Sequence, residues 1–110
     1  MATGYYQLKQ GTSGKFSFNL KAGNHEVILV SQSYDSKSGA QGGIESVRKH
    51  GPDAKNYEKK SSSANQPYFV LKASNGQIIG TSEMYSSEAA RDSGIASVQA
   101  NSVSTTVKEE

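Results

Sequence analysis

Apolar and polar side chains alternate along Phe16–Ala22, and this alternation is the clearest pattern in the first half of the chain. A period of two is typical of a strand with one buried face. A second extended run, Glu26–Gln32, is rich in valine and isoleucine. Farther along, small and apolar residues recur at positions i, i+3, i+4 and i+7, which predicts a helix with one buried face. These helical positions are Ala40, Gly43, Ile44 and Val47.

This pattern is written twice. A shift of 51 residues aligns 18–47 with 69–98 without a gap, and about a third of the positions from 6 to 50 are identical to their partners. A structural repeat of this length is typical of a unit that buries its apolar face only against a second copy. The repeated positions in the first copy are Phe18, Leu20, Lys21, Asn24, Tyr34, Ser36, Gly43, Ile44 and Val47. Their partners in the second copy are Phe69, Leu71, Lys72, Asn75, Tyr85, Ser87, Gly94, Ile95 and Val98.

The repeat predicts an α+β fold made of two tandem β-β-β-α-β units. We expect one antiparallel sheet with both helices packed on one of its faces, because each unit of about 50 residues is too small to be stable alone. The chain is then one domain, 1–110, with repeat one at 4–51 and repeat two at 55–102. In the same register the tail TTVKEE falls on AKNYEK, so we expect a closing strand at 104–109 that pairs near the first copy. The terminal strands are in this sense exchanged.

Turn and cap residues mark the ends of these elements. Asn75-Gly76 predicts a type I′ hairpin, and His25 stands where the second copy has Gly76. Ser36 and Ser87 are predicted N-caps of the two helices. Gly43 and Gly94 lie on the buried helix faces, where a glycine either lets a helix approach the sheet closely or breaks it into two. The sequence leaves both alternatives open.

Composition indicates the compartment in which we expect the protein but does not indicate its activity. The chain has 110 residues, no cysteine, and a formal net charge of +2. The absence of cysteine favours a reducing compartment, and no apolar run is long enough to cross a membrane, so we expect a cytoplasmic protein without a membrane partner. The small basic excess does not by itself indicate nucleic-acid binding. Since the second copy already supplies the partner that one copy would need, we expect a monomer.

The repeated motif set resembles the YegP-like family of small bacterial proteins. It comprises Phe-x-Leu-Lys-Ala-x-Asn, then Ile, Ser-x-x-Tyr-x-Ser and Gly-Ile-x-Ser-Val. The resemblance covers nearly the whole chain and implies the same two-unit sheet with exchanged terminal strands. It brings no established activity, so it carries over no catalytic residue.

The stretches that resemble catalytic or cofactor-binding motifs are better explained by structural roles. The glycine-rich stretch GAQGGIESV (39–47) lacks the lysine of a phosphate loop, and only Gly43 of its three glycines recurs in the second copy. His25 and His50 have no histidine partners, and without cysteine there is no ligand set with metal spacing. We therefore predict no enzyme, no cofactor and no metal. An enzyme would require a cleft that joins Tyr34, Ser36 and His50.

The strand alternation leaves one candidate binding face opposite the helices. Its members are Ser17, Asn19, Lys21, Tyr68, Val70 and Lys72. The first hypothesis is a non-enzymatic binding or accessory module that uses this face or a sheet edge to bind a protein. The alternative is weak binding of single-stranded nucleic acid by the lysine and tyrosine side chains. The simplest interpretation of the lysines is a solvated face that keeps the sheet from aggregating.

Overall fold

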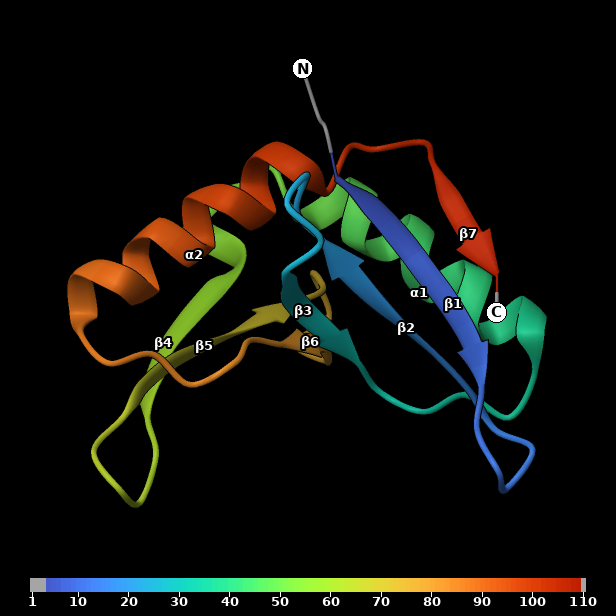
Figure 1. The fold of residues 1–110 in the computed structure, drawn as a ribbon, viewed down its shortest axis with the longest axis horizontal. Helices are drawn as coiled ribbons and strands as arrows, with labels where there is room; N and C mark the ends of the chain where they lie inside the picture. The colour runs from blue at the N-terminus through green and yellow to red at the C-terminus, as the bar shows by residue number, and fades with distance from the viewer. Residues whose placement is uncertain (1–3, 110) are drawn as a thin grey trace.

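The computed structural model describes residues 4–109, which form a sheet of seven strands and two α-helices (Figure 1). Each unit has three strands followed by one helix, as the repeat predicts. The first unit contains β1 (Tyr5–Gln10), β2 (Phe16–Lys21), β3 (Val27–Ser31) and α1 (Lys37–His50). A short 3-10 helix, Ala54–Asn56, leads into the second unit. The second unit contains β4 (Tyr57–Ser61), β5 (Pro67–Lys72), β6 (Ile78–Thr81) and α2 (Glu88–Asn101), and is followed by β7 (Val107–Glu109).

The strand order is β4-β5-β6-β3-β2-β1-β7, so the third strands of the two units meet in the middle of the sheet. The β3–β6 pairing joins Val30 to Thr81 in antiparallel register. Figure 1 shows the two units side by side, with their long hairpin loops at opposite lower corners. The predicted closing strand is present, since β7 pairs with β1 of the other unit. This one pairing is parallel, whereas every other pairing among the described strands is antiparallel.

Each hairpin loop of the described sheet uses one residue with a positive φ. These residues are Gly14, His25, Asn65 and Gly76. The prediction of a type I′ turn at Asn75-Gly76 is wrong, because Asn75 has a negative φ and only Gly76, at φ 86°, is left-handed. The amide of Gly76 donates to the carbonyl of Ala73, which is a type I turn followed by a left-handed residue. The side chain of Asn75 selects this turn because its oxygen accepts from the amide of Gln77 at 3.0 Å.

Both helices begin at the predicted serine caps and continue unbroken through their glycines. The hydroxyl of Ser36 accepts from the amide of Gly39 at 3.0 Å, and Ser87 caps α2 in the same way through Ala90. A β-carbon on Gly43 would collide with the ring of Tyr34. Close packing, and not a break in the helix, therefore explains this glycine.

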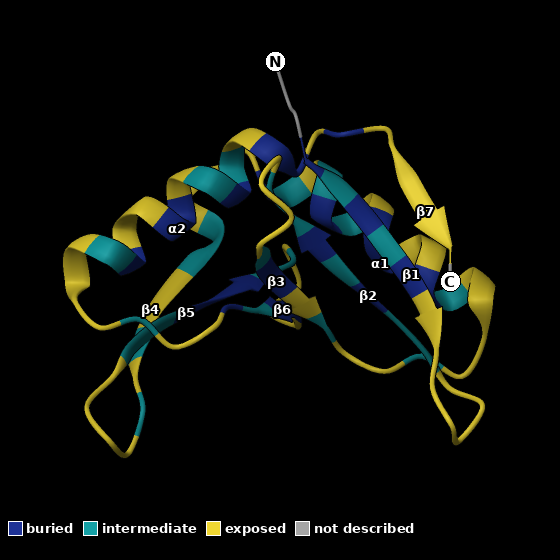
Figure 2. Ribbon diagram, viewed as in Figure 1, coloured by how far each residue is buried: buried dark blue, intermediate teal, exposed yellow. Residues whose placement is uncertain are grey.

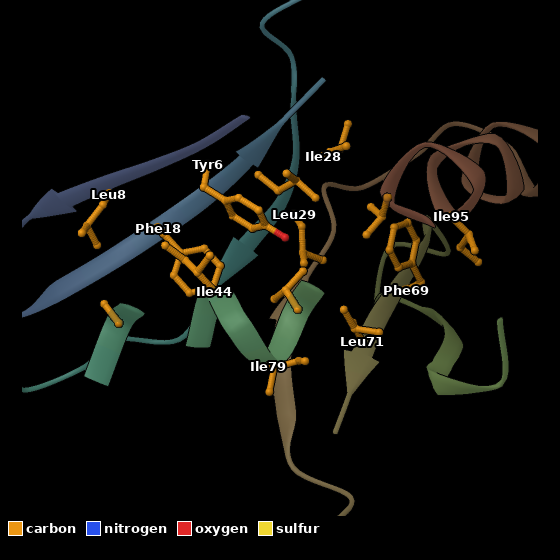
Figure 3. Packing of buried hydrophobic residues seen from close by; sticks show 14 residues of the cluster. Tyr6, Leu8, Phe18, Ile28, Leu29, Ile44, Phe69, Leu71, Ile79 and Ile95 are labelled. Carbon is orange, nitrogen blue, oxygen red and sulfur yellow. The ribbon is translucent and has the colours of Figure 1, made fainter. Parts of the chain in front are cut away.

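The core lies between the sheet and the two helices. Alternate strand residues such as Phe18 and Phe69 meet Ile44 of α1 and Ile95 of α2 in one buried cluster (Figure 3). Because residues from both helices join this cluster, the helices cover the same face of the sheet, as predicted. Among residues 4–109, neither helix has the length and apolarity needed to span a membrane.

Equivalent tyrosines attach the end of each helix to the first strand of the other unit by a hydrogen bond. The hydroxyl of the half-buried Tyr57 donates to the carbonyl of Gly51 at 2.7 Å, and the buried hydroxyl of Tyr6 donates to the carbonyl of Ser102 at 2.6 Å. In the first case the two residues are joined by a short connection, whereas in the second they are 96 residues apart. The amide of Gly4 also donates to the side chain of Asn101 at 2.8 Å. After α1, the chain itself leads into β4. After α2, hydrogen bonds attach the end of the helix to β1, to which it has no direct chain connection.

Candidate binding face of the sheet

The face opposite the helices carries a continuous row of side chains across every strand of the described sheet. Residues that face each other in register share a side of the sheet, so the strand pairing defines this row. From one edge to the other it reads Lys108, Gln7, Asn19, Val30, Thr81, Val70 and Glu58. Neither helix contributes a residue to it. We refer to this side of the sheet as the open face.

The predicted face residues share this side. Ser17, Asn19 and Lys21 alternate with the buried residues of β2, and Tyr68, Val70 and Lys72 alternate with those of β5. One of them differs from the prediction, because Val70 is only 3% exposed and is not displayed to solvent. It lies on an interior strand with Glu58 opposite on one side and Thr81 opposite on the other. Lys21 and Lys72 occupy the same open face.

The open face carries more positive charge than the sequence pattern indicated. Lys9 pairs with Ser17, Lys60 pairs with Tyr68, and Lys108 pairs with Gln7, so all three join Lys21 and Lys72 on this side. Among the residues of the seven strands, this face therefore holds five lysines and one glutamate, Glu58. The whole chain has a formal net charge of only +2, so the remainder of the chain is net negative. The charge is segregated onto one face.

Ion pairing divides the lysines into two groups. The two lysines of repeat two are partly neutralised, because Glu58 contacts Lys72 at 2.5 Å and Lys60 at 3.9 Å. The hydrogen bond from Lys72 holds the pKa of the Glu58 carboxyl below its usual value. Within residues 4–109, Lys9, Lys21 and Lys108 form no ion pair. Uncompensated charge is therefore concentrated on the half of the face formed by β2, β1 and β7.

Tyr5 lies at the centre of this uncompensated group. The ammonium of Lys108 lies 4.5 Å from the centroid of its ring, and that of Lys21 lies 6.0 Å from it. Its hydroxyl forms a hydrogen bond of 3.0 Å with Nδ1 of His25. The left-handed backbone of His25, at φ 71°, places the imidazole edge-on to the tyrosine ring. Two ammonium groups and one imidazole thus contact the same tyrosine.

Sequence reasoning missed Tyr5, Lys9, Lys60 and Lys108 as members of the face. Tyr5 and Lys9 lie in a short first strand whose facing was not assigned, and Lys108 lies in a three-residue strand with little periodicity. The alternation of Tyr6 and Leu8 with polar residues would have assigned the facing of the first strand. Nothing in the sequence pattern places Lys108 beside Gln7, because that neighbourhood depends on the parallel β1–β7 pairing.

The residues that an enzyme hypothesis would need are not brought together. Ser36 caps the first turn of α1 and His50 is its last residue, so they lie roughly 20 Å apart at 1.5 Å per residue. His50 instead forms a bridge from the helix end to a hairpin, where its Nε2 accepts from the amide of Ser74 at 3.3 Å. Tyr34 packs its ring on Phe18 with a centroid distance of 6.3 Å. Each of these residues has a structural contact of its own.

The comparisons with known proteins agree with this architecture. The family model described as a domain of unknown function, DUF1508, matches twice, at residues 12–58 and 62–109. Each match begins later than the repeat units defined above, so that it ends in the strand after the helix. The chain is 50% identical to the UPF0339 protein YegP of Yersinia pestis, over 99% of this chain and 97% of that protein. It is 53% identical to a UPF0339 protein of Shewanella oneidensis, over 97% of each chain.

Solved structures show the same fold. The solution NMR structure of the Shewanella oneidensis UPF0339 protein superposes with a TM-score of 0.92 and 53% identity, over 97% of this chain and 91% of that chain. The NMR structure of the Escherichia coli protein yegP, described as a protein of unknown function, gives a TM-score of 0.93 and 50% identity, over 100% and 94% of the two chains. These matches confirm the resemblance to YegP-like proteins and indicate no specific function. The chain belongs to the DUF1508 family and carries two tandem copies of its domain.

Proposed function

We propose that this protein is a non-enzymatic binding module that binds a polyanion through its open sheet face. The observation that supports the proposal best is the segregation of charge. Five lysines share the open face with one carboxylate, while the remainder of the chain is net negative. A basic face on an otherwise acidic molecule attracts and orients a negatively charged partner.

The arrangement of the other lysines supports the same conclusion. On the helix side, Lys37 pairs with Glu109 and Lys59 pairs with Asp92 at 3.2 Å. By contrast, Lys9, Lys21 and Lys108 on the open face form no ion pair within residues 4–109. A surface specialised for an anionic partner accounts for the difference, because an acidic neighbour would compete with that partner.

We infer a monomer in a reducing, cytoplasmic environment as the setting of this function. The β3–β6 pairing already joins the two units through the middle of the sheet. The chain contains no cysteine, so its stability does not depend on an oxidising compartment. We assign no cofactor to this activity.

Binding to a panel of polyanions tests the proposal. Fluorescein-labelled polyglutamate, heparin and oligothymidine are titrated with the protein at about 50 mM and about 200 mM salt, and anisotropy is measured. We expect at least one of these probes to bind with an affinity that falls as salt rises. Polylysine with the same label is the control of opposite charge. If no polyanion binds at the lower salt concentration, or if polylysine binds equally well, the proposal is wrong.

A further inference from the structure

The two halves of the open face differ at one decisive pair of equivalent positions. Gln7 in repeat one corresponds to Glu58 in repeat two. Both belong to the row of side chains that crosses the open face from Lys108 to Glu58, which we call the central row. Glu58 neutralises the lysines around it, whereas the neutral amide of Gln7 has no charge with which to do so. Lys21 and Lys72 are thus the same residue in the repeat but lie in different electrostatic surroundings.

A second difference is the aromatic residue beneath the free lysines. Tyr5 corresponds to Asn56, which belongs to the 3-10 helix and donates to the carbonyl of His50 at 2.9 Å. Repeat one also gains Lys108 from β7, while β4 of repeat two is the opposite edge of the described sheet. Repeat one therefore has two ammonium groups on one tyrosine ring, an arrangement that the described part of repeat two lacks. Two ammonium groups that share one ring, with no carboxylate paired to either among the described residues, favour an anionic group such as a phosphate.

The open face also offers a partner for a nucleic-acid base. Tyr68 lies on β5, which runs in the same direction as β1 because four antiparallel pairings separate them. Tyr5 and Tyr68 each precede the central row by two residues, so they lie on the same side of it. Four strand spacings separate them by roughly 19 Å along the sheet. Among the described residues no other ring contacts Tyr68, which leaves its ring able to stack on a base.

We propose that the open face binds single-stranded nucleic acid, with a phosphate held by Lys21 and Lys108 over Tyr5 and a base stacked on Tyr68. This inference rests on the proposed function and names its ligand and its main subsite. The nucleic acid crosses the sheet from β1 toward β5. Between these two strands, the central row supplies neutral polar contacts from Asn19 and Thr81. Polyglutamate, the acidic peptide probe, would contact the lysines but would gain no stacking on Tyr68, because it has neither bases nor aromatic rings.

Equivalent substitutions in the two repeats provide a matched test. Lys21→Glu and Lys72→Glu make the same charge reversal at the same position of the repeat, and both side chains are on the surface. Labelled oligothymidine is titrated by anisotropy at about 50 mM salt, and we expect Lys21→Glu to weaken binding roughly tenfold and Lys72→Glu to change it less than about twofold. Thermal unfolding of each variant confirms that its fold is intact. Equal losses in the two variants would overturn the assignment of the subsite to repeat one.

A further variant distinguishes the ligand classes. Tyr68→Ala is expected to weaken the binding of oligothymidine several-fold and to leave the binding of polyglutamate unchanged, because only the former has bases. If polyglutamate binds at least as tightly as oligothymidine and Tyr68→Ala affects neither, the nucleic-acid inference is wrong while the proposed polyanion module stands. If none of the polyanions binds, both are wrong.

Discussion

The hydroxyl group of Tyr34 occupies the space that a β-carbon on Gly43 would need. Tyr85 and Gly94 have the same relationship in the second unit, and the two tyrosines stack on Phe18 and Phe69 with ring planes 12° and 10° from parallel. The repeated glycine therefore makes room for a tyrosine that lies between helix and sheet. Because burial disfavours the phenolate, it also raises the pKa of Tyr34 above its ordinary value.

Alanine at adjacent glycines of α1 should have opposite effects on stability. Gly43→Ala should lower the free energy of unfolding by about 1–3 kcal/mol, because the new methyl group displaces the ring of Tyr34. Gly42→Ala should raise it by about 0.5–1 kcal/mol, since nothing lies within 4 Å of its β-carbon position and alanine is the better helix former. Urea denaturation measures both. A stabilising Gly43→Ala would show that the tyrosine moves aside without cost.

The tyrosines that attach the helix ends to the first strands should make the protein sensitive to alkaline pH. Burial raises the pKa of Tyr6 and Tyr57 well above the ordinary value of 10.0. Their contribution to stability is therefore complete below about pH 10, where both states are protonated, and falls above it, because the unfolded chain loses these protons first. We expect the free energy of unfolding to decrease progressively as the pH rises from about 10 to about 12. Urea denaturation across this range measures the slope.

The double variant Tyr6→Phe/Tyr57→Phe is the control for this pH dependence. It should be less stable at neutral pH, by about 1–3 kcal/mol for each hydrogen bond to a backbone carbonyl that it removes. Its free energy of unfolding should nevertheless depend less on pH in the alkaline range, because phenylalanine does not ionise. An unchanged alkaline slope would mean that other groups, such as the lysines, govern the effect.

Exchange of the two equivalent residues in the central row should reverse the asymmetry of the open face. Gln7→Glu introduces a carboxylate opposite Lys108 and should weaken oligothymidine binding roughly tenfold at about 50 mM salt. Glu58→Gln frees Lys72 and Lys60 and should strengthen it. The logarithmic salt dependence should become shallower in Gln7→Glu, by about 0.7 for each phosphate that the lysines no longer neutralise. An affinity that is unchanged in both variants would contradict a role for the central row.

The last strand should be dispensable for folding. Every residue of β7 is exposed, as Figure 2 shows, and its pairing with β1 covers only three positions. A chain that ends at Ser104 keeps the hydrogen bond from the hydroxyl of Ser104 to the carbonyl of Gly4, at 2.7 Å. Its loss of stability should stay below about 2 kcal/mol, because few hydrogen bonds are removed and fewer residues need to be ordered. Failure of this shortened chain to fold, seen by circular dichroism, would assign β7 to the essential fold.

Local patterns in the sequence determined the elements and their buried sides. The period of two in Phe16–Ala22, the helical spacing of Gly43, Ile44 and Val47, and the serine caps each depend on residues within a few positions of one another. The internal repeat then supplied the pairing of two equal units, because neither buries its apolar face alone. The turn type at Asn75-Gly76 was predicted wrongly, because the same residue pair fits two turns and the side chain of Asn75 decides between them.

Tertiary structure alone decided which charges share the open face and which are neutralised. The sequence by itself placed Lys21 and Lys72 on one side of the sheet, and as a repeated pair they are indistinguishable. Their difference arises from a carboxylate on β4 in one case and an ammonium group on β7 in the other. Both neighbours come from other strands, and which strands lie side by side is decided by packing of the whole core and not by local pattern. The asymmetry of the candidate site is therefore a property of the folded sheet.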